Sequence, residues 1–377
     1  MNKVSHFVSL FENLPDQRQE WKIRHKLVDI LFIAVVATIA DCDDWEEMEW
    51  FAQEKEDWFR QYLELPNGIP SHDTIQRVFS WLDPELFRQR FLQWVQGNVS
   101  GQAAAGVIAI DGKTMRGSRD RTKKALHVVN AWFSETGMVL GQVFTEEKSN
   151  EMTAIPELLE ILTVAGHIVT IDAAGTYPAI AEKIVNKHGD YVLAVKGNQP
   201  NLMEDIRLFF ETEEADEHSE YKLQRITRRE KGHGRIETRT YVTSEEIGWL
   251  RPRQTWEGLK SIGMVRSHVE ELSTGTIREE TRYYISSLPA EVSRFAYAVR
   301  QHWGVESMHW VLDVTFQEDG RRSRKGDSAK NLSQLLRLTY DILKSADRPK
   351  NWPLKRLRKR ALVDNRYLDR LVSTLFQ

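Results

Sequence analysis

Two aspartates stand at the same place in two similar segments of this chain. Asp111 directly follows the apolar run 107–110, and Asp172 directly follows the apolar run 168–171. Short apolar runs rich in β-branched residues are typical of strands buried on both faces. A charged side chain is costly inside such a strand, so we expect each aspartate at a strand end, where water, a metal ion or a phosphate reaches it. One such aspartate is most simply a turn residue, and it is the repetition that indicates chemistry.

A third acidic residue, Glu306, lies far downstream in a helix rich in histidine and tryptophan. Aspartates at the ends of neighbouring strands lie side by side, and a glutamate from a helix packed on the sheet completes a cluster of oxygen ligands. Mg²⁺ and Mn²⁺ prefer such ligands. Two ions of this kind, about 4 Å apart, bind the attacking and the leaving oxygen of a phosphodiester. The three carboxylates are therefore candidates for metal-dependent phosphoryl transfer.

We favour Glu306 over the nearby Glu318 as the third carboxylate. The side chains that flank Glu306 at helical spacing are His302, Trp303, His309 and Trp310. We expect this aromatic face to be buried in the core against the sheet, which points Glu306 toward the strand ends. Glu318 lies in the segment 317–320, whose composition is that of a loop in water. The alternative is that Glu306 pairs with Arg300 or a histidine and only organises the helix.

A zinc site is a competing interpretation of the same helix. His302, Glu306 and His309 are spaced at i, i+4 and i+7 and share one helix face, which would allow them to bind zinc. Their order is not that of the zinc proteases, and histidines on such a face are more often packed and hydrogen-bonded. Other enzyme classes lack their motifs here, since the sequence has neither a phosphate-binding glycine loop nor a dinucleotide-binding or nucleophile-elbow motif.

The charge distribution suggests a polyanionic partner. The 377 residues carry a net charge of only −3, but the segments 321–330 and 348–360 are strongly basic. Solvated helix faces are the simpler explanation for such runs. If DNA is the partner, the candidate phosphate contacts are Lys113, Arg116, Lys196, Arg300, Arg321, Arg322, Lys355, Arg356, Arg358 and Lys359. The single cysteine fits a reducing cytoplasm, and the longest apolar run, 30–40, is too short to span a membrane.

The order of the predicted elements indicates an α/β protein with helical ends. Residues 1–100 show helical periodicity with tight turns, so a helix-turn-helix DNA reader is one interpretation. Strands are predicted at 107–111, 126–133, 138–145, 168–172 and 191–195, with helices at 152–163, 178–188, 293–312 and 328–345. The predicted units are a helical domain (1–100), a first core segment (106–200), a β-rich insertion (201–290), the rest of the core (291–345) and a basic helical tail (346–377).

The longest motifs of the chain carry a family resemblance. They are the segments 69–78, 108–116, 145–158, 190–199, 282–287 and 302–313. In these segments, and in their order from end to end, the chain resembles the H-repeat-associated transposases of bacterial insertion sequences, which belong to the DDE transposases.

The resemblance implies a ribonuclease-H-like core in which Asp111, Asp172 and Glu306 are the catalytic, metal-binding triad for Mg²⁺ or Mn²⁺, with two ions expected. It also implies an N-terminal helical associated domain and a β-strand insertion before the helix that carries Glu306. The expected activity is cleavage of insertion-sequence ends and strand transfer into target DNA. We expect a homodimer assembled on DNA, in the bacterial cytoplasm at the nucleoid, with no membrane partner. The alternatives are a retired transposase that only binds DNA and a zinc hydrolase.

Overall fold

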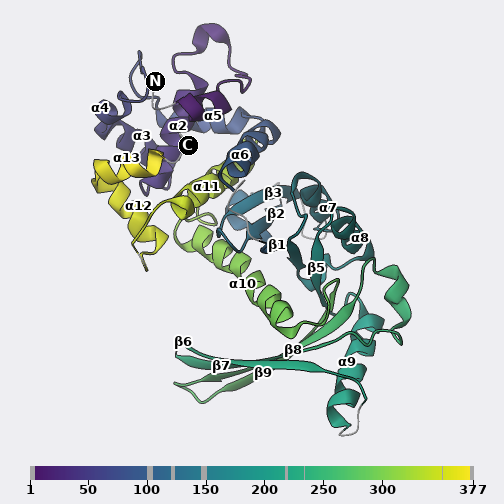
Figure 1. Ribbon diagram of the computed structural model, residues 1–377. Helices are drawn as coiled ribbons and strands as arrows, with labels where there is room; N and C mark the ends of the chain where they lie inside the picture. Colours follow the sequence, from purple (N-terminus) through teal and green to yellow (C-terminus); the bar gives the residue numbers. More distant parts are fainter. Residues whose placement is uncertain are drawn as a thin grey trace.

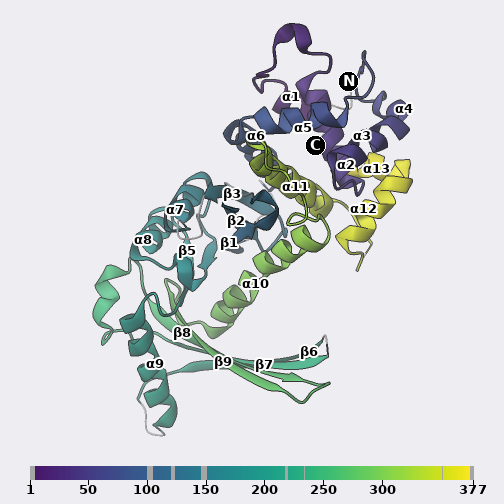
Figure 2. The same cartoon turned by 180° about the vertical axis from the view of Figure 1, so that it is seen from behind.

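The fold consists of a helical part at one end, a long sheet, and one long helix, α10, that runs between them (Figures 1 and 2). The computed structural model describes residues 5–99, 105–119, 124–145, 151–216, 220–232, 234–349 and 351–373. Within these residues, no helix is both long and apolar enough to cross a membrane. The mixed α/β architecture expected from the sequence is confirmed.

Among the described residues, nine strands form one sheet in the order β3-β2-β1-β4-β5-β9-β8-β7-β6. The first five strands are β1 (Val107–Met115), β2 (Leu126–Phe133), β3 (Val139–Thr145), β4 (Ile168–Ile171) and β5 (Asp190–Val195). Strands β1, β4 and β5 are parallel to one another, and on one side β2 pairs antiparallel with β1 and β3 pairs antiparallel with β2. The parallel strands lie at the centre, and they are the apolar runs that the sequence predicted as buried strands.

The predicted β-rich insertion forms strands, but it extends the core sheet instead of forming a separate one. Its strands are β6 (Gln224–Gly232), β7 (Arg235–Ser244), β8 (Ser261–Glu271) and β9 (Ile277–Ser286), and β9 pairs with β5. A helix that the sequence analysis did not predict, α9 (Pro200–Ala215), precedes these strands. Its buried residues Leu202, Ile206, Phe209 and Phe210 have helical spacing, a signal hidden by the acidic residues that follow.

Helices cover both faces of the central strands. The helices α7 (Glu151–Ile161) and α8 (Pro178–Asn186) pack on one face, and α10 (Val292–Val314) crosses the other (Figure 1). In β1, Ile108 and Ile110 join the core under α7, whereas Ala109 joins the core shared with α10. Since side chains alternate along a strand, Asp111 faces α10 as well.

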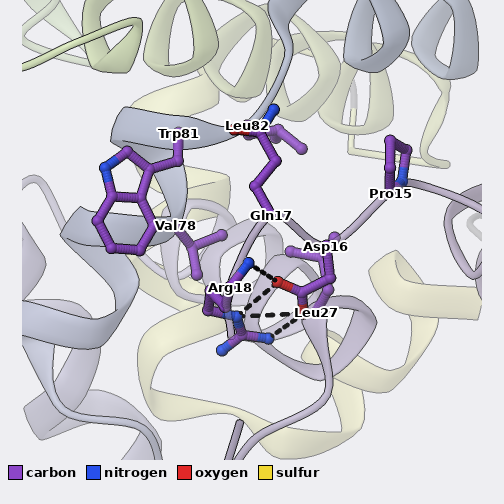
Figure 3. A pocket seen from close by; sticks show the side chains of 8 residues that line it. All are labelled: Pro15, Asp16, Gln17, Arg18, Leu27, Val78, Trp81 and Leu82. Carbon is purple, nitrogen blue, oxygen red and sulfur yellow. Dashed lines mark hydrogen bonds and ion pairs between the residues drawn. The ribbon is translucent and has the colours of Figure 1, made fainter. Parts of the chain in front are cut away.

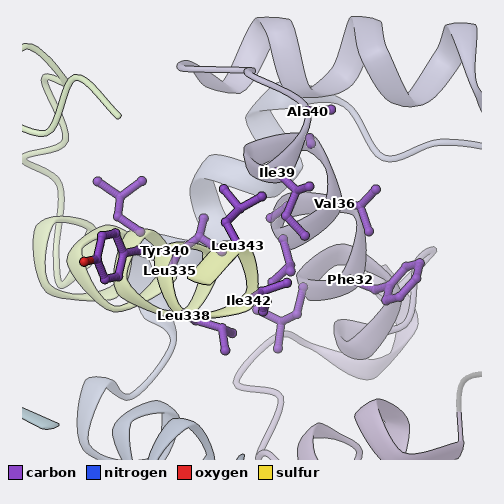
Figure 4. Packing of buried hydrophobic residues seen from close by; sticks show 14 of the residues in the cluster. Phe32, Val36, Ile39, Ala40, Leu335, Leu338, Tyr340, Ile342 and Leu343 are labelled. Atoms are coloured by element: carbon purple, nitrogen blue, oxygen red, sulfur yellow. The ribbon is translucent and has the colours of Figure 1, made fainter. Parts of the chain in front are cut away.

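The helical part joins both ends of the chain. Its N-terminal helices are α1 (Ser5–Phe11), α2 (Leu27–Ile39), α3 (Trp45–Glu54), α4 (Glu56–Phe59), α5 (His72–Trp81) and α6 (Pro84–Val99). The helix α11 (Ser328–Ser345) packs against α2, α5, α6 and β3 and is buried along almost its whole length. Figure 4 shows Ile39 of α2 beside Leu343 of α11, and Phe32 and Val36 belong to the same buried cluster.

The predicted basic tail is helical and packs on the N-terminal helices. It forms α12 (Leu354–Val363) and α13 (Asn365–Ser373). Trp58 and Tyr62 both donate to a carboxylate oxygen of Asp369, at 2.8 and 2.6 Å. The buried Arg358 forms ion pairs with Asp41 and Asp43. The two ends of the chain therefore share one hydrophobic core, which also reaches α10 and the face of β1 that carries Asp111.

Candidate active site at the ends of the central strands

The register of the parallel strands places Asp111 beside Asp172. The last paired residues of β1 and β4 are Ile110 and Ile171, and each aspartate comes next in its chain. Asp172 ends its strand as predicted and accepts a hydrogen bond from the backbone N–H of Gly175 at 3.3 Å. Asp111 does not end its strand, because β1 continues to Met115 in pairing with β2. Asp111 is unpaired on the side of β4 because β4 ends at Ile171, before β1 does.

Glu306 lies across from these aspartates on α10. The side chain of Glu306 is exposed in part, but partial burial of its carboxyl raises its pKa, and the negative charges of Asp111 and Asp172 raise it further. This electrostatic coupling shows that the three predicted carboxylates share one region of the molecule. The structure also shows that Arg300, the alternative partner of Glu306, instead lies 3.7 Å from Glu230 of β6.

The donor set fits a hard divalent cation. Three carboxylates that repel one another are stabilised by a cation with a preference for oxygen ligands. Among the residues that the structure describes, no three acidic, histidine or cysteine side chains are already close enough to hold a metal ion. Binding would therefore draw Asp111, Asp172 and Glu306 together.

The two histidines of α10 are bound to protein groups. His302 Nδ1 lies 3.0 Å from Thr170 Oγ1, and burial lowers the pKa of His302. His309 Nδ1 lies 3.5 Å from Asp111 Oδ2, and its Nε2 lies 3.1 Å from the amide nitrogen of Asn130. Burial raises the pKa of Asp111, but His309, His302 and a backbone hydrogen bond from Gly112 together outweigh this effect, and the pKa lies below its ordinary value. These contacts use both nitrogens of His309, so they favour a supporting role over zinc ligation.

A buried ionic cluster lies next to the carboxylates and corrects the prediction for Glu318. This residue lies in a turn, as predicted, but it is fully buried and not exposed to water, with Arg337 Nη1 at 2.5 Å and Lys113 Nζ at 2.8 Å. Burial would raise the pKa of Glu318, but the charges of Arg337 and Lys113 lower it to about 2. The sequence signal for this cluster is Arg337 itself, a charged residue between Leu335, Leu336 and Leu338.

Three of the predicted phosphate contacts are buried inside the protein. Lys113 is bound by Glu318 and by Asp313 and Asp319, at 2.5 and 3.1 Å. Arg321 pairs with Asp43 at 2.7 Å, and burial lowers its pKa to about 10. Arg358 is fully buried in the contacts described above. Their positive charges are neutralised by carboxylates, so Lys113, Arg321 and Arg358 are structural residues.

The other predicted phosphate contacts are exposed at the surface. They are Arg116, Lys196, Arg300, Arg322, Lys355, Arg356 and Lys359. Arg116 lies just past β1, with 85% of its side chain exposed. In α12 the pattern is amphipathic, since Leu357 and Arg358 face the core while the three basic residues of the other face contact water.

A groove of about 860 Å³ lies between α10 and the strands β6–β9. Its basic lining residues are Lys231, Arg235, Arg239, Arg278, Arg282 and Arg300, and Glu306 lies on its α10 wall. Trp303 and Trp310 also line it. The prediction that both tryptophans belong to the core is wrong. Trp310 is 62% exposed, and Trp303 is half-buried in the wall of the groove, where the guanidinium of Arg282 lies 4.9 Å from the centre of its ring.

A second depression, in the helical part, is too small to hold a ligand. Its volume is about 10 Å³, and Figure 3 shows Arg18 there, bound to the carboxylate of Asp16. The groove beside Glu306 is thus the better candidate for a substrate site.

Comparison with known proteins identifies the family. Residues 102–342 match the family described as Transposase DDE domain, and residues 8–95 match the family described as DDE_Tnp_1-associated. The chain belongs to the DDE transposase family. This confirms the resemblance inferred from the sequence motifs. The family match spans the strands and helices that carry the three carboxylates.

Full-length relatives in this transposase family support the assignment. A protein of Escherichia coli O157:H7 named as the transposase YncI is 41% identical over 96% of this chain and 93% of its own length. A protein of Escherichia coli K12 named as the H repeat-associated transposase YhhI is 38% identical over 99% of this chain and 98% of its own length. A shorter relative from the same strain, named as the inactive transposase YbfQ, is 48% identical over 21% of this chain.

Proposed function

We propose that this chain is a metal-dependent DNA transposase that binds the ends of its own element, cleaves them and joins the 3′-hydroxyl to target DNA. The observation that carries the proposal is the register of β1 and β4, which brings Asp111 beside Asp172, with Glu306 facing them from α10. The strand order β3-β2-β1-β4-β5 supports a ribonuclease-H-like core for this chemistry.

In this proposal the three carboxylates hold Mg²⁺ or Mn²⁺, with two ions expected. When bound, the metal activates a water or a 3′-hydroxyl and offsets charge on the leaving oxygen. The protein's own residues do the rest. His309 orients Asp111, the backbone N–H of Gly175 orients Asp172, and Trp303 and Trp310 shape the groove beside Glu306.

Exposed cations supply the contacts to DNA in this proposal. Phosphates bind Lys and Arg side chains in a way that depends on salt and not on sequence. The proposed contacts are Arg116, Lys196, Arg300, Arg322, Lys355, Arg356 and Lys359, which excludes the buried cations. We also propose that the transposase works as a homodimer on DNA and acts at the nucleoid in the cytoplasm.

Incubation with the flanking element ends and Mg²⁺, followed by mapping of the cut strands, tests the proposal. We expect cleavage by the wild type and none by Asp111→Ala or Asp172→Ala, while DNA binding of both variants stays within a few fold. Each substitution removes a metal ligand and not a phosphate contact. Retained Mg²⁺-dependent nicking in both variants would refute the assignment of the site.

A DNA-binding protein without catalysis is the second candidate function. The observation that favours it is the relative named as an inactive transposase. Wild-type protein that binds the element ends but does not nick them with Mg²⁺ or Mn²⁺ would support this second function.

A further inference from the structure

A line of buried polar contacts leads from Asp111 into the helical part of the molecule. His309 of α10 contacts Asp111 through Nδ1 and Asn130 of β2 through Nε2. Asn130 Oδ1 in turn accepts a hydrogen bond from Arg337 Nε of α11 at 2.6 Å. Asn130 and Arg337 are fully buried, and Asn130 is the direct partner of Asp111 in the register of β1 and β2.

The direction of every hydrogen bond in this line follows from the chemistry of arginine. A guanidinium only donates, so the oxygen of the Asn130 amide must face Arg337. The nitrogen of that amide then faces His309, and it also points to the carbonyl oxygen of Val128 at 3.5 Å, which only accepts. Since the amide nitrogen donates, Nε2 of His309 must accept and therefore carries no proton. The proton of the neutral ring lies on Nδ1, toward Asp111.

The position of Arg337 is itself fixed. Its Nη1 is bound by Glu318 and by the backbone oxygen and the hydroxyl of Ser333, at 3.1 and 2.8 Å. Glu318 alone neutralises the charge of Arg337, yet the Nε of Arg337 donates to the neutral amide of Asn130. Besides satisfying the buried Nε–H, that contact fixes the orientation of Asn130, because a flipped amide would place two donors against each other.

We propose that Arg337 and Asn130 are positioning residues that hold His309 in the Nδ1–H tautomer, so that this N–H orients the carboxylate of Asp111. The inference rests on the proposed function in one respect, namely that Asp111 is a metal ligand. Supporting hydrogen bonds of this kind change metal affinity by about 10–100-fold. These hydrogen bonds link α11, in the helical part of the molecule, to the candidate active site.

The first test replaces Asn130 by aspartate, which nearly preserves its shape and keeps an acceptor for Arg337. The second carboxylate oxygen then faces Nε2 of His309 and draws a proton to it. With ¹⁵N-labelled histidine and His309→Asn to assign the resonance, NMR of the metal-free wild type should show Nε2 of His309 unprotonated. In Asn130→Asp the same nitrogen should be protonated, and the affinity for Mn²⁺ should fall by about 10–100-fold.

The second test uses Arg337→Lys, which keeps a cation near Glu318 but removes the donor that fixes the amide. We expect weaker Mn²⁺ binding and a mixture of His309 tautomers. Arg321→Lys is the matched control, since Arg321 is also buried but pairs with Asp43. It should leave both readouts unchanged. Circular dichroism establishes that each variant is folded.

Two outcomes would overturn the inference. One is a wild-type His309 with its proton on Nε2, and the other is an unchanged Mn²⁺ affinity in a folded Asn130→Asp. Failure of the proposed function gives a different result, because Asp111→Ala would then bind Mn²⁺ as tightly as the wild type. The NMR readout needs neither metal nor DNA and therefore tests the tautomer by itself.

Discussion

At the scale of single residues, two glutamates close together in sequence have opposite environments. Glu306 is exposed in the groove and is coupled to two other carboxylates. Glu318 is fully buried between two cations. The first arrangement suits a residue that receives a metal ion, and the second suits a residue that holds the fold together.

Substituting these two glutamates should therefore separate catalysis from stability. Glu306→Gln should keep the fold, abolish cleavage and weaken Mn²⁺ binding. Glu318→Gln should lower the free energy of unfolding by about 3 kcal/mol or more, because Lys113 and Arg337 lose their shared counter-charge. Denaturant titration and a nicking assay measure the two effects. A Glu306→Gln that still nicks, or a Glu318→Gln as stable as the wild type, would contradict this division.

The buried Asp341 predicts a pH dependence of stability. Burial raises the pKa of Asp341 well above its usual value, outweighing its hydrogen bond from the backbone N–H of Val139 and the charges of Lys344 and Arg337. Because its pKa is higher in the folded protein than in the unfolded chain, the protonated carboxyl contributes fully to stability at pH values below the pKa of the unfolded chain. This contribution is lost as the pH rises through the pKa of the folded protein. Asp341→Asn keeps the acceptor and removes the ionisation.

The melting temperature of Asp341→Asn should therefore exceed that of the wild type, and by more at about pH 8 than at about pH 5. Thermal unfolding at both pH values measures the difference. The exposed Asp347→Asn is the control and should show no such trend. An equal shift at both pH values would mean that the ionisation of Asp341 does not limit stability.

At the scale of elements, α12 has two faces with different roles. Lys355, Arg356 and Lys359 are exposed, while Arg358 is buried. Changing the three exposed residues to glutamine should weaken binding to specific and random DNA alike. The logarithm of the DNA-binding constant decreases with the logarithm of the salt concentration, and the steepness of this decrease should become smaller by about 0.9 for each DNA phosphate that the variant no longer binds. Binding measured over a series of salt concentrations tests this, and an unchanged slope would mean that this face is only solvated.

A glycine determines how closely α10 approaches the sheet. A Cβ on Gly304 would lie 2.1 Å from the ring of Trp132 in β2, so no other residue fits there without movement of the helix or the ring. This close approach allows α10 to present His309 and Glu306 to the ends of β1 and β4.

At the scale of the whole molecule, both ends of the chain and the central sheet share one core. Arg358 joins α12 to the end of α2, since its Nε donates to the carbonyl oxygen of Thr38 at 3.1 Å and its guanidinium pairs with Asp41 and Asp43. Arg358→Ala should therefore destabilise the protein by about 3 kcal/mol, because it removes a fully buried cation from the partly buried carboxylates of Asp41 and Asp43. Chemical denaturation measures this effect. Arg356→Ala, on the exposed face, is the control and should change stability by less than about 0.5 kcal/mol.

The sequence by itself determined the central strands and the candidate carboxylates. The runs before Asp111 and Asp172 are apolar, β-branched and short, and these local properties suffice to predict buried strands, although β1 continues past Asp111. The helix around Glu306 was predicted for the same reason, since its apolar periodicity is local. The family motifs are also a property of the sequence, and comparison with known proteins confirmed them.

Only the tertiary structure decided which polar residues are buried. Glu318, Arg337 and Arg358 are charged, and although the apolar neighbours of Arg337 indicate burial, no neighbouring residue identifies the distant partners that neutralise these charges. Trp310 is apolar, yet it lies in the groove because the helix face that contacts the sheet is occupied by Met308, His309 and Leu312. The burial of a charge or the exposure of an aromatic ring depends on which surfaces meet, and that is settled by packing between distant segments.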